Sequence, residues 1–242
     1  DQQADGVLKN NYLSLSTAFH KGLDGEGMKR LTIGFQATYS NKNLNTTNLK
    51  FEDQLRSDGF TGITNEIFQN NQLNISYMDL NTGILFSNNT YNGTSYYIGA
   101  SLYHLNKPNE SFRGGEFRLA PRYTAHAGLY LPLNDNVILH TSGLFQSQAG
   151  AHETVIGGAL GYTFAGATED NATTFYAGSW YRFGDAFIPY IGLEFGKFRV
   201  GASYDVNTSS LKSVSNSRGG FELSLIYINR PNSEHSLPCP KF

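Results

Sequence analysis

Apolar and polar residues alternate with a period of two in many long segments of this sequence. In residues 31–40 the alternation is unbroken, and one face would carry Leu31, Ile33, Phe35, Ala37 and Tyr39. The opposite face would carry Thr32, Gly34, Gln36, Thr38 and Ser40. Successive side chains of a β-strand point to opposite faces, so this period predicts a strand with one apolar face.

The same period recurs along the chain and predicts about eleven strands. Apolar residues at three- and four-residue spacing between helix caps do not occur over any long stretch, so helices are expected to be few and short. We therefore predict an all-β fold. The expected strands cover residues 11–20, 29–40, 76–87, 95–105, 121–132, 137–147, 153–164, 172–183, 186–195, 198–207 and 219–229.

The length of these segments favours a membrane protein over a soluble sheet. A tilted strand that crosses a bilayer needs about 9 to 11 residues, whereas strands of soluble sheets usually have about five or six. The sequence has no apolar run of the roughly 18 to 20 residues that a membrane helix requires. We expect residues 1–229 to form a transmembrane antiparallel β-barrel, followed by a tail at residues 230–242.

The composition agrees with this architecture and excludes some functions. Charged residues make up 16% of the chain, well below the roughly 25% of soluble domains. A formal net charge of −2 gives no basic surface for nucleic acid. The single cysteine, Cys239, excludes an internal disulfide and a multi-cysteine metal site. No cofactor is expected.

The predicted connections are mostly short on one side of the sheet and long on the other. Outer-membrane barrels combine short periplasmic turns with longer outer loops. The long connections are residues 41–75, 106–120 and 207–218, although Gly184 and Asp185 form a tight turn on the same side. We expect these loops outside the cell and the tail at residues 230–242 in the periplasm.

An odd number of strands conflicts with closure of a barrel. Bacterial barrels of one chain normally have an even number of strands. An open edge in lipid would leave backbone groups unpaired at several kcal/mol each. We therefore expect further strands upstream of Asp1, and three such strands would give a barrel of fourteen.

Several motifs, spaced along nearly the whole chain, resemble those of one family. They are residues 51–54 in a long loop, residues 106–112 and 121–128, Trp180, Tyr181 and Arg182 with residues 185–187, the strand at residues 201–206, and the ending Cys239, Pro240, Lys241 and Phe242. In this order they resemble the PorP/SprF family of the Bacteroidota type IX secretion system. The sequence lacks that family's N-terminal section with an Asn-Pro-Ala-Phe-type motif, which agrees with the expectation of further strands.

The resemblance implies a function in protein secretion. It implies an integral outer-membrane protein of the secretion and gliding apparatus, needed for export or surface attachment of large adhesins through their C-terminal domains. It also implies periplasmic partners among the secretion and gliding components. A porin or transporter for small solutes is the alternative, and a barrel lipase is a third possibility.

The expected partner-binding residues lie in the outer loops and the tail. Loops on a rigid scaffold are where binding usually resides. Two loop segments and the chain ending contribute them. These residues are Phe51, Asp53, Gln54, Asn109, Glu110, Ser111, Phe112, Cys239, Pro240 and Phe242.

A second set of polar residues is expected to face the lumen, because they alternate with the apolar positions. They either line a passage or form paired charges that brace the wall, and the balance of acids and bases favours pairing. The set consists of Gln36, His126, Arg182, Glu194, Arg199, Asp205 and Glu222.

Signals for catalysis are weak, and we expect no catalytic, metal or cofactor site. The six histidines show no metal-ligand spacing, and a Gly-x-Ser-x-Gly elbow is absent. His140 beside Thr141 and Ser142 comes nearest to a nucleophile and base. Neighbouring residues of a strand point to opposite faces, which argues against such a pair.

Overall fold

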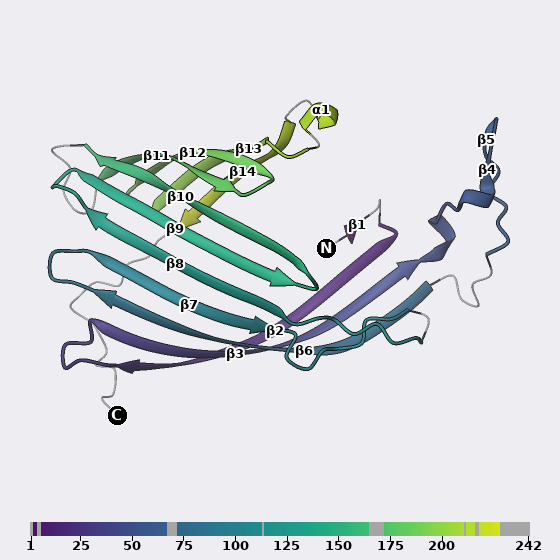
Figure 1. Cartoon of the computed structure of the whole chain (residues 1–242), viewed down its shortest axis with the longest axis horizontal. Coiled ribbons are helices and arrows are strands. Elements are labelled where there is room, and N and C mark those ends of the chain that lie inside the picture. The colour runs from purple at the N-terminus through teal and green to yellow at the C-terminus, as the bar shows by residue number, and fades with distance from the viewer. Residues whose placement is uncertain are drawn as a thin grey trace.

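The chain forms a large antiparallel sheet whose strands follow one another in sequence order (Figure 1). This computed structural model describes residues 2–3, 6–66, 72–112, 114–164, 172–210, 212–215 and 218–227. The prediction of an all-β chain is confirmed. The strands of the sheet are β1 (Gln2–Gln3), β2 (Leu8–Gly22), β3 (Lys29–Asn45), β6 (Gln72–Asn89), β7 (Ser95–Tyr103), β8 (Arg122–Pro132), β9 (Val137–Gln148), β10 (Ala151–Thr163), β11 (Thr173–Arg182), β12 (Ala186–Phe195), β13 (Phe198–Asn207) and β14 (Arg218–Tyr227).

The remaining elements are short and lie in two of the long connections. Between β3 and β6 lie the 3₁₀ turns η1 (Thr46–Asn48) and η2 (Glu52–Gln54) and the small hairpin of β4 (Leu55–Arg56) and β5 (Gly59–Phe60). Between β13 and β14 lies the helix α1 (Lys212–Ser215). Within the part of the chain described here, no helix is long and apolar enough to span a membrane.

Strands β3 and β6 are longer than predicted. They have 17 and 18 residues, and their pairing continues from Asn41 opposite Ser76 to Asn45 opposite Gln72. The expected loop at residues 41–75 was therefore wrong at both ends, and the connection itself covers residues 46–71. The polar extension pairs through side chains as well, because the Asn41 amide donates to Asn74 Oδ1 at 2.7 Å.

The two faces of the sheet differ in chemistry as the alternation predicts. In the register, Ile33 lies opposite Ile84, which lies opposite Ala100, so apolar residues of successive strands share one face. Many large apolar residues are exposed there, including Leu15 (79%) and Phe35 (58%). Among the described residues only Ala159, Tyr176 and Ala186 form a buried hydrophobic set. An apolar face of this kind suits hydrocarbon rather than water.

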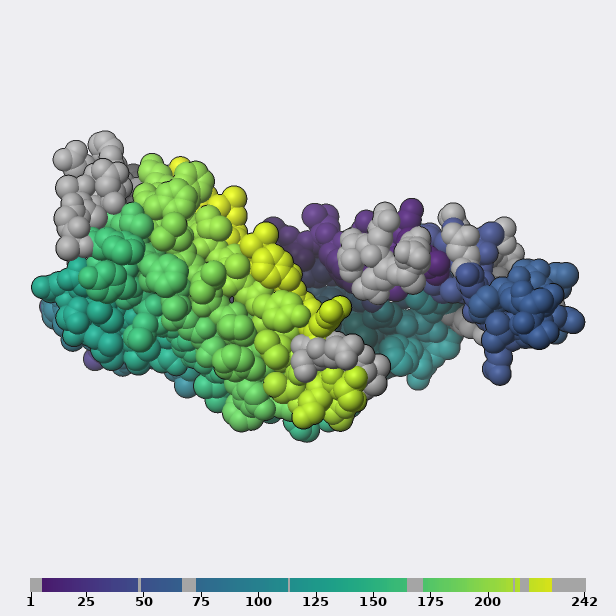
Figure 2. Space-filling view, turned by 90° about the horizontal axis from the view of Figure 1, so that it is seen from above, coloured from purple at the N-terminus to yellow at the C-terminus, as the bar shows by residue number. Residues whose placement is uncertain are grey.

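The polar face is concave. Side chains from β7, β8, β9, β11, β12 and β13 on this face line one common pocket, which requires the sheet to curl around them. Figures 1 and 2 show the resulting curved wall, with the strands near β14 turned over toward those near β2.

The sheet is open in the described part of the chain. Its order runs from β1 and β2 at one edge to β14 at the other, and these edges are not hydrogen-bonded to each other. The curvature and the two faces are consistent with a β-barrel. The further strands expected upstream stay a prediction.

Candidate functional site

Arg199 and Glu194 form an ion pair on the concave face. They lie opposite each other on β13 and β12, and Arg199 donates through Nε to Glu194 Oε2 at 2.8 Å. A second nitrogen, Nη2, donates to the same oxygen. The guanidinium also lies 5.1 Å from the ring centre of Tyr176, whose hydroxyl donates to Glu194. The sequence placed Arg199 and Glu194 on one face, and the register makes them partners.

Arg182 stands at the centre of a second charged cluster. Its Nη1 lies 2.8 Å from Asp185 and 3.1 Å from Asp205, and its Nε lies 3.9 Å from Glu153. The register between β13 and β14 shifts between Tyr204 and Val206. A β-bulge of this kind re-aims a side chain, and here the irregularity falls at Asp205.

Gln36 belongs to a network of polar side chains on β2, β3 and β6. Its amide donates to Ser16 Oγ at 3.0 Å and its carbonyl accepts from Asn81 Nδ2 at 3.0 Å. Asn81 in turn accepts from the backbone of His104, whose ring lies 3.0 Å from Asp79. Asp79 and Asn81 are buried, so this part of the wall is braced by hydrogen bonds.

The other two predicted concave residues differ in their surroundings. His126 packs against the ring of Tyr97 at 5.5 Å. Glu222 is exposed because β14 lies at the edge of the sheet. The lining role of the seven residues stays a prediction, and the ion pairs support the bracing interpretation over an ion passage.

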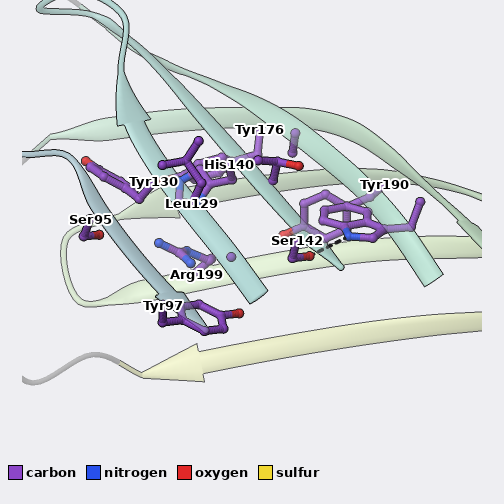
Figure 3. A pocket seen from close by; sticks show the side chains of 13 residues that line it. Ser95, Tyr97, Leu129, Tyr130, His140, Ser142, Tyr176, Tyr190 and Arg199 are labelled. Atoms are coloured by element: carbon purple, nitrogen blue, oxygen red, sulfur yellow. Dashed lines mark hydrogen bonds between the residues drawn. The ribbon is translucent and has the colours of Figure 1, made fainter. Parts of the chain in front are cut away.

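Sequence reasoning missed an aromatic pocket on the same face. The pocket has a volume of about 310 Å³ and takes rings from five strands. Figure 3 shows Tyr97, Tyr130, His140, Tyr176, Tyr190 and Arg199 around it. The signal was the recurrence of aromatic residues at the polar positions of β7, β8, β9, β11 and β12.

The structure corrects one argument about His140. Ser142 lies two residues along β9 from His140, so both line the pocket and only Thr141 belongs to the opposite face by register. The Ser142 hydroxyl, however, accepts a hydrogen bond from Trp180 Nε1 at 2.9 Å.

The loop between β7 and β8 is folded back on itself. Asn109 Oδ1 accepts from the backbone of Phe117 at 2.7 Å, and its amide donates to the Gly115 carbonyl. An isolated bridge joins Asn109 to Arg118. Ser111 and Phe112 are half-buried. The predicted partner-binding residues of this loop thus sit in an ordered hairpin.

Glu110 anchors that loop to the extended part of β3 and β6. Its carboxylate pairs with Lys42 and accepts from the Tyr77 hydroxyl at 3.2 Å. Burial lowers the pKa of Lys42, but the hydrogen bond to Glu110 and nearby negative charge outweigh burial, and the pKa is raised above its ordinary value. The ammonium therefore stays charged across the neutral range.

Asp53 and Gln54 shape the loop between β3 and β6 from within. The Asp53 carboxylate accepts from Thr64 Oγ1 and from the backbone of Asn65 at 2.6 Å. Gln54 is buried, and its side-chain carbonyl accepts from the backbone of Phe51 at 2.8 Å. The acidic motif therefore holds the turn in shape, and Phe51 is half-buried beside it.

Three exposed apolar residues of this loop, which lie beside exposed charged ones such as Arg56 and Asp58, were not among the predicted residues. Leu55, Phe60 and Ile63 expose 58%, 52% and 78% of their surfaces. They lie on or next to β4 and β5, which project away from the sheet in Figure 1. We call these three residues the apolar tip. Cys239, Pro240 and Phe242 lie outside the described residues.

The model of the type IX secretion system membrane protein PorP/SprF family matches residues 2–227. The chain belongs to the PorP/SprF family. This match covers every strand of the sheet and confirms the resemblance seen in the spaced motifs. The protein is therefore a membrane protein of the type IX secretion system. No curated protein matches the chain.

Proposed function

We propose that this PorP/SprF protein is a non-enzymatic outer-membrane barrel that supports export or surface attachment of large adhesins. It would bind their C-terminal domains on its outer side and periplasmic secretion and gliding components on the other. The observation that carries the proposal is the family match over residues 2–227.

The sheet supports a location in the outer membrane. Bacterial outer-membrane proteins cross lipid as antiparallel barrels with an outward apolar band and a polar interior. The exposed apolar face and the polar concave face of this sheet have that arrangement. The long strands β3 and β6 would carry their loop beyond the bilayer on the outer side.

The outer loops support docking of a folded partner. The loop between β3 and β6 is held by Asp53 and Gln54, and the loop between β7 and β8 is anchored by Glu110. Such ordering lowers the entropy lost on binding. The apolar tip offers the buried contacts on which affinity usually depends. In this proposal the tail with Cys239, Pro240 and Phe242 would face the periplasmic partners.

The proposal is tested by retention of an adhesin's C-terminal domain. We expect the triple variant Leu55→Ser, Phe60→Ser and Ile63→Ser to retain at least tenfold less of that domain in a detergent pull-down. The matched control is Tyr91→Ser, because Tyr91 is 79% exposed on a turn at the opposite end of the strands. Equal retention by the triple variant and the control would contradict docking at the apolar tip.

A deletion and an electrical measurement separate docking from solute transport. Removal of residues 106–118 should also reduce retention of the adhesin domain. In planar bilayers the docking function predicts a blocked lumen and therefore no steady conductance. A large open conductance together with unchanged retention would favour a porin instead.

A further inference from the structure

Aromatic rings on the concave face lie directly over glycines of the same sheet. A methyl group added at Gly128 would lie 2.5 Å from the ring of Tyr97, and one added at Gly161 would lie 2.6 Å from the ring of Tyr176. At Gly157 it would lie 2.5 Å from Cγ of Trp180. Only glycine leaves room for a ring this close to the backbone, so these rings lie flat against the sheet. Tyr97 is exposed on this face, whereas the ring of Tyr176 is buried beneath the Arg199 guanidinium.

The pocket over these rings combines flat apolar surfaces with a polar rim. Its volume of about 310 Å³ falls at the small end of ligand pockets. Tyr97, Tyr130, Tyr176, Trp180 and Tyr190 supply rings, and Trp180 meets Tyr190 edge to face at 5.7 Å. Figure 3 shows that Arg199 and His140 stand among them.

One polar atom in the pocket lacks a partner. His140 Nε2 is buried and makes no hydrogen bond within the described part of the chain. The His140 ring is held edge to face by Tyr130 at 4.9 Å and by Tyr176 at 5.5 Å. A buried polar atom without a partner costs free energy. Because Nε2 is closed off by its neighbours, a ligand hydroxyl would pair with it only after the His140 ring turns toward the pocket.

The charge of the pocket is balanced. Arg199 uses Nε and Nη2 for Glu194, and among the described residues no other charged side chain lines the pocket. Neither an anion nor a cation would therefore find an uncompensated partner. Arg199 offers donors at the pocket, and the hydroxyls of the tyrosines that line it can donate and accept.

We propose that this pocket binds a neutral sugar ring. A pyranose places C–H groups against aromatic faces and hydroxyls around its edge, which matches flat rings surrounded by donors and acceptors. The phenyl ring of a peptide side chain would fill the same volume but leave the polar rim buried without partners. The proposal goes beyond adhesin docking and rests on the pocket alone.

The single tryptophan of this sequence, Trp180, gives a direct readout. Purified protein in detergent is titrated with the neutral disaccharides maltose, lactose and cellobiose while tryptophan emission is recorded. We expect at least one of them to shift the emission saturably, with calorimetry giving the same dissociation constant. Glucuronate should bind no more tightly than that disaccharide.

Variants assign the signal to the pocket. Tyr190→Leu should weaken sugar binding at least tenfold, and Tyr190→Phe, which keeps the ring, should weaken it less. Tyr103→Leu is the matched control, because Tyr103 lies on the same face beneath Arg122 and outside this pocket. Circular dichroism checks that each variant keeps its sheet.

Four results would overturn the proposal. These are no saturable signal with any of the three disaccharides, equal affinity in Tyr190→Leu, tighter binding of glucuronate, and tighter binding of a neutral phenylalanine peptide. The last result would assign the pocket to a peptide side chain.

Discussion

At the scale of single residues, Gly178 shows how closely the strands of the wall approach each other. A methyl group at this position would lie 2.3 Å from the carbonyl oxygen of Gly158 and 2.5 Å from Ala159 Cβ. We expect Gly178→Ala to lower the free energy of unfolding in lipid vesicles by about 1–3 kcal/mol, because the backbone must move. Urea titration measures this value. Gly34→Ala is the control, since its nearest atom would lie at 3.8 Å, and equal losses in both variants would contradict the steric argument.

The Arg199–Glu194 pair allows a double-mutant test. Their side chains are 30% and 14% exposed, so Glu194→Gln leaves a half-buried guanidinium without its carboxylate. We expect a loss of about 1–3 kcal/mol, below the 3–5 kcal/mol of a fully buried pair. The double variant Glu194→Gln and Arg199→Gln should regain more than half of it, again by urea titration. A double variant less stable than Glu194→Gln would show that the pair does not act as a unit.

The alternation of residues predicted the face of each polar residue but not its partners. Arg182 and Asp205 were expected on one face, and they lie 3.1 Å apart. That contact depends on the register of three strands and on the shift at Asp205, which periodicity does not encode. The same holds for the pocket, because its rings come from strands far apart in sequence.

At the scale of elements, the base of the loop between β7 and β8 is held by the ion pair of Glu110 with Lys42 and by hydrogen bonds between Asn106 and the backbone of β6. We expect Glu110→Gln to raise hydrogen exchange at residues 106–120 several-fold and to lower the free energy of unfolding by about 1–3 kcal/mol, because the pair is about as buried as Arg199 and Glu194. Hydrogen exchange with mass spectrometry measures the first quantity. The control is Glu116→Gln, because Glu116 is an exposed residue of the same loop. An unchanged exchange rate in Glu110→Gln would show that Glu110 does not anchor the loop.

The raised pKa of Lys42 sets the pH range of this anchor. A lysine whose pKa is higher in the folded state contributes stability below its unfolded value of about 10.4 and loses it as the pH rises through the folded value. Protection of the loop from a protease should therefore be constant between pH 7 and 9. It should fall only in strongly alkaline buffer, and a fall near pH 8 would contradict the assignment to Lys42.

Element boundaries were predictable where one face is apolar and not where both are polar. The expected strand at residues 29–40 ended where the apolar residues end, yet β3 continues to Asn45. Beyond the apolar band, both faces of β3 and β6 carry polar residues, and the strands are held by backbone pairing and by contacts such as Asn41 with Asn74. In β6 the alternation even reverses there, because Leu73 and Ile75 lie on the face that carries Asp79 and Asn81 further along the strand, so it no longer matches the pattern of the apolar band.

At the scale of the whole molecule, the exposed apolar face makes a prediction about insertion. Leu15 lies in the middle of β2 and is 79% exposed. We expect Leu15→Lys to reduce the free energy of folding into vesicles by about 2–4 kcal/mol, because the charge would face hydrocarbon. Folding titrations with flotation of the vesicles measure this.

Asn11→Lys is the matched control for Leu15→Lys. Asn11 lies on the same strand and face, four residues from Leu15, and beside Lys9 on the extension that pairs with residues 40–45. Its loss should be about 1 kcal/mol or less, since charges near the interface cost little. Similar losses in both variants would mean that this face does not contact lipid.

The eleven long strands followed from the sequence, because each repeats the same chemical contrast, whereas the two-residue strands β1, β4 and β5 were not predicted. The curvature did not follow, since it arises from twist and from the packing of rings over glycines across many strands. The sequence therefore predicted a sheet with one apolar and one polar face, and the structure was needed to find the aromatic pocket on the concave face.

The connections on the side of the sheet proposed to face outward differ in length. Two residues, Ala149 and Gly150, suffice between β9 and β10, whereas residues 46–71 join β3 to β6. This side of the sheet therefore extends far beyond the strands at the connection between β3 and β6 and only slightly at the turn between β9 and β10. A bound protein would contact the side of the long connection and lie above the short turn. Probes attached at Gly150 and at Ile63 should therefore contact different surfaces of that protein.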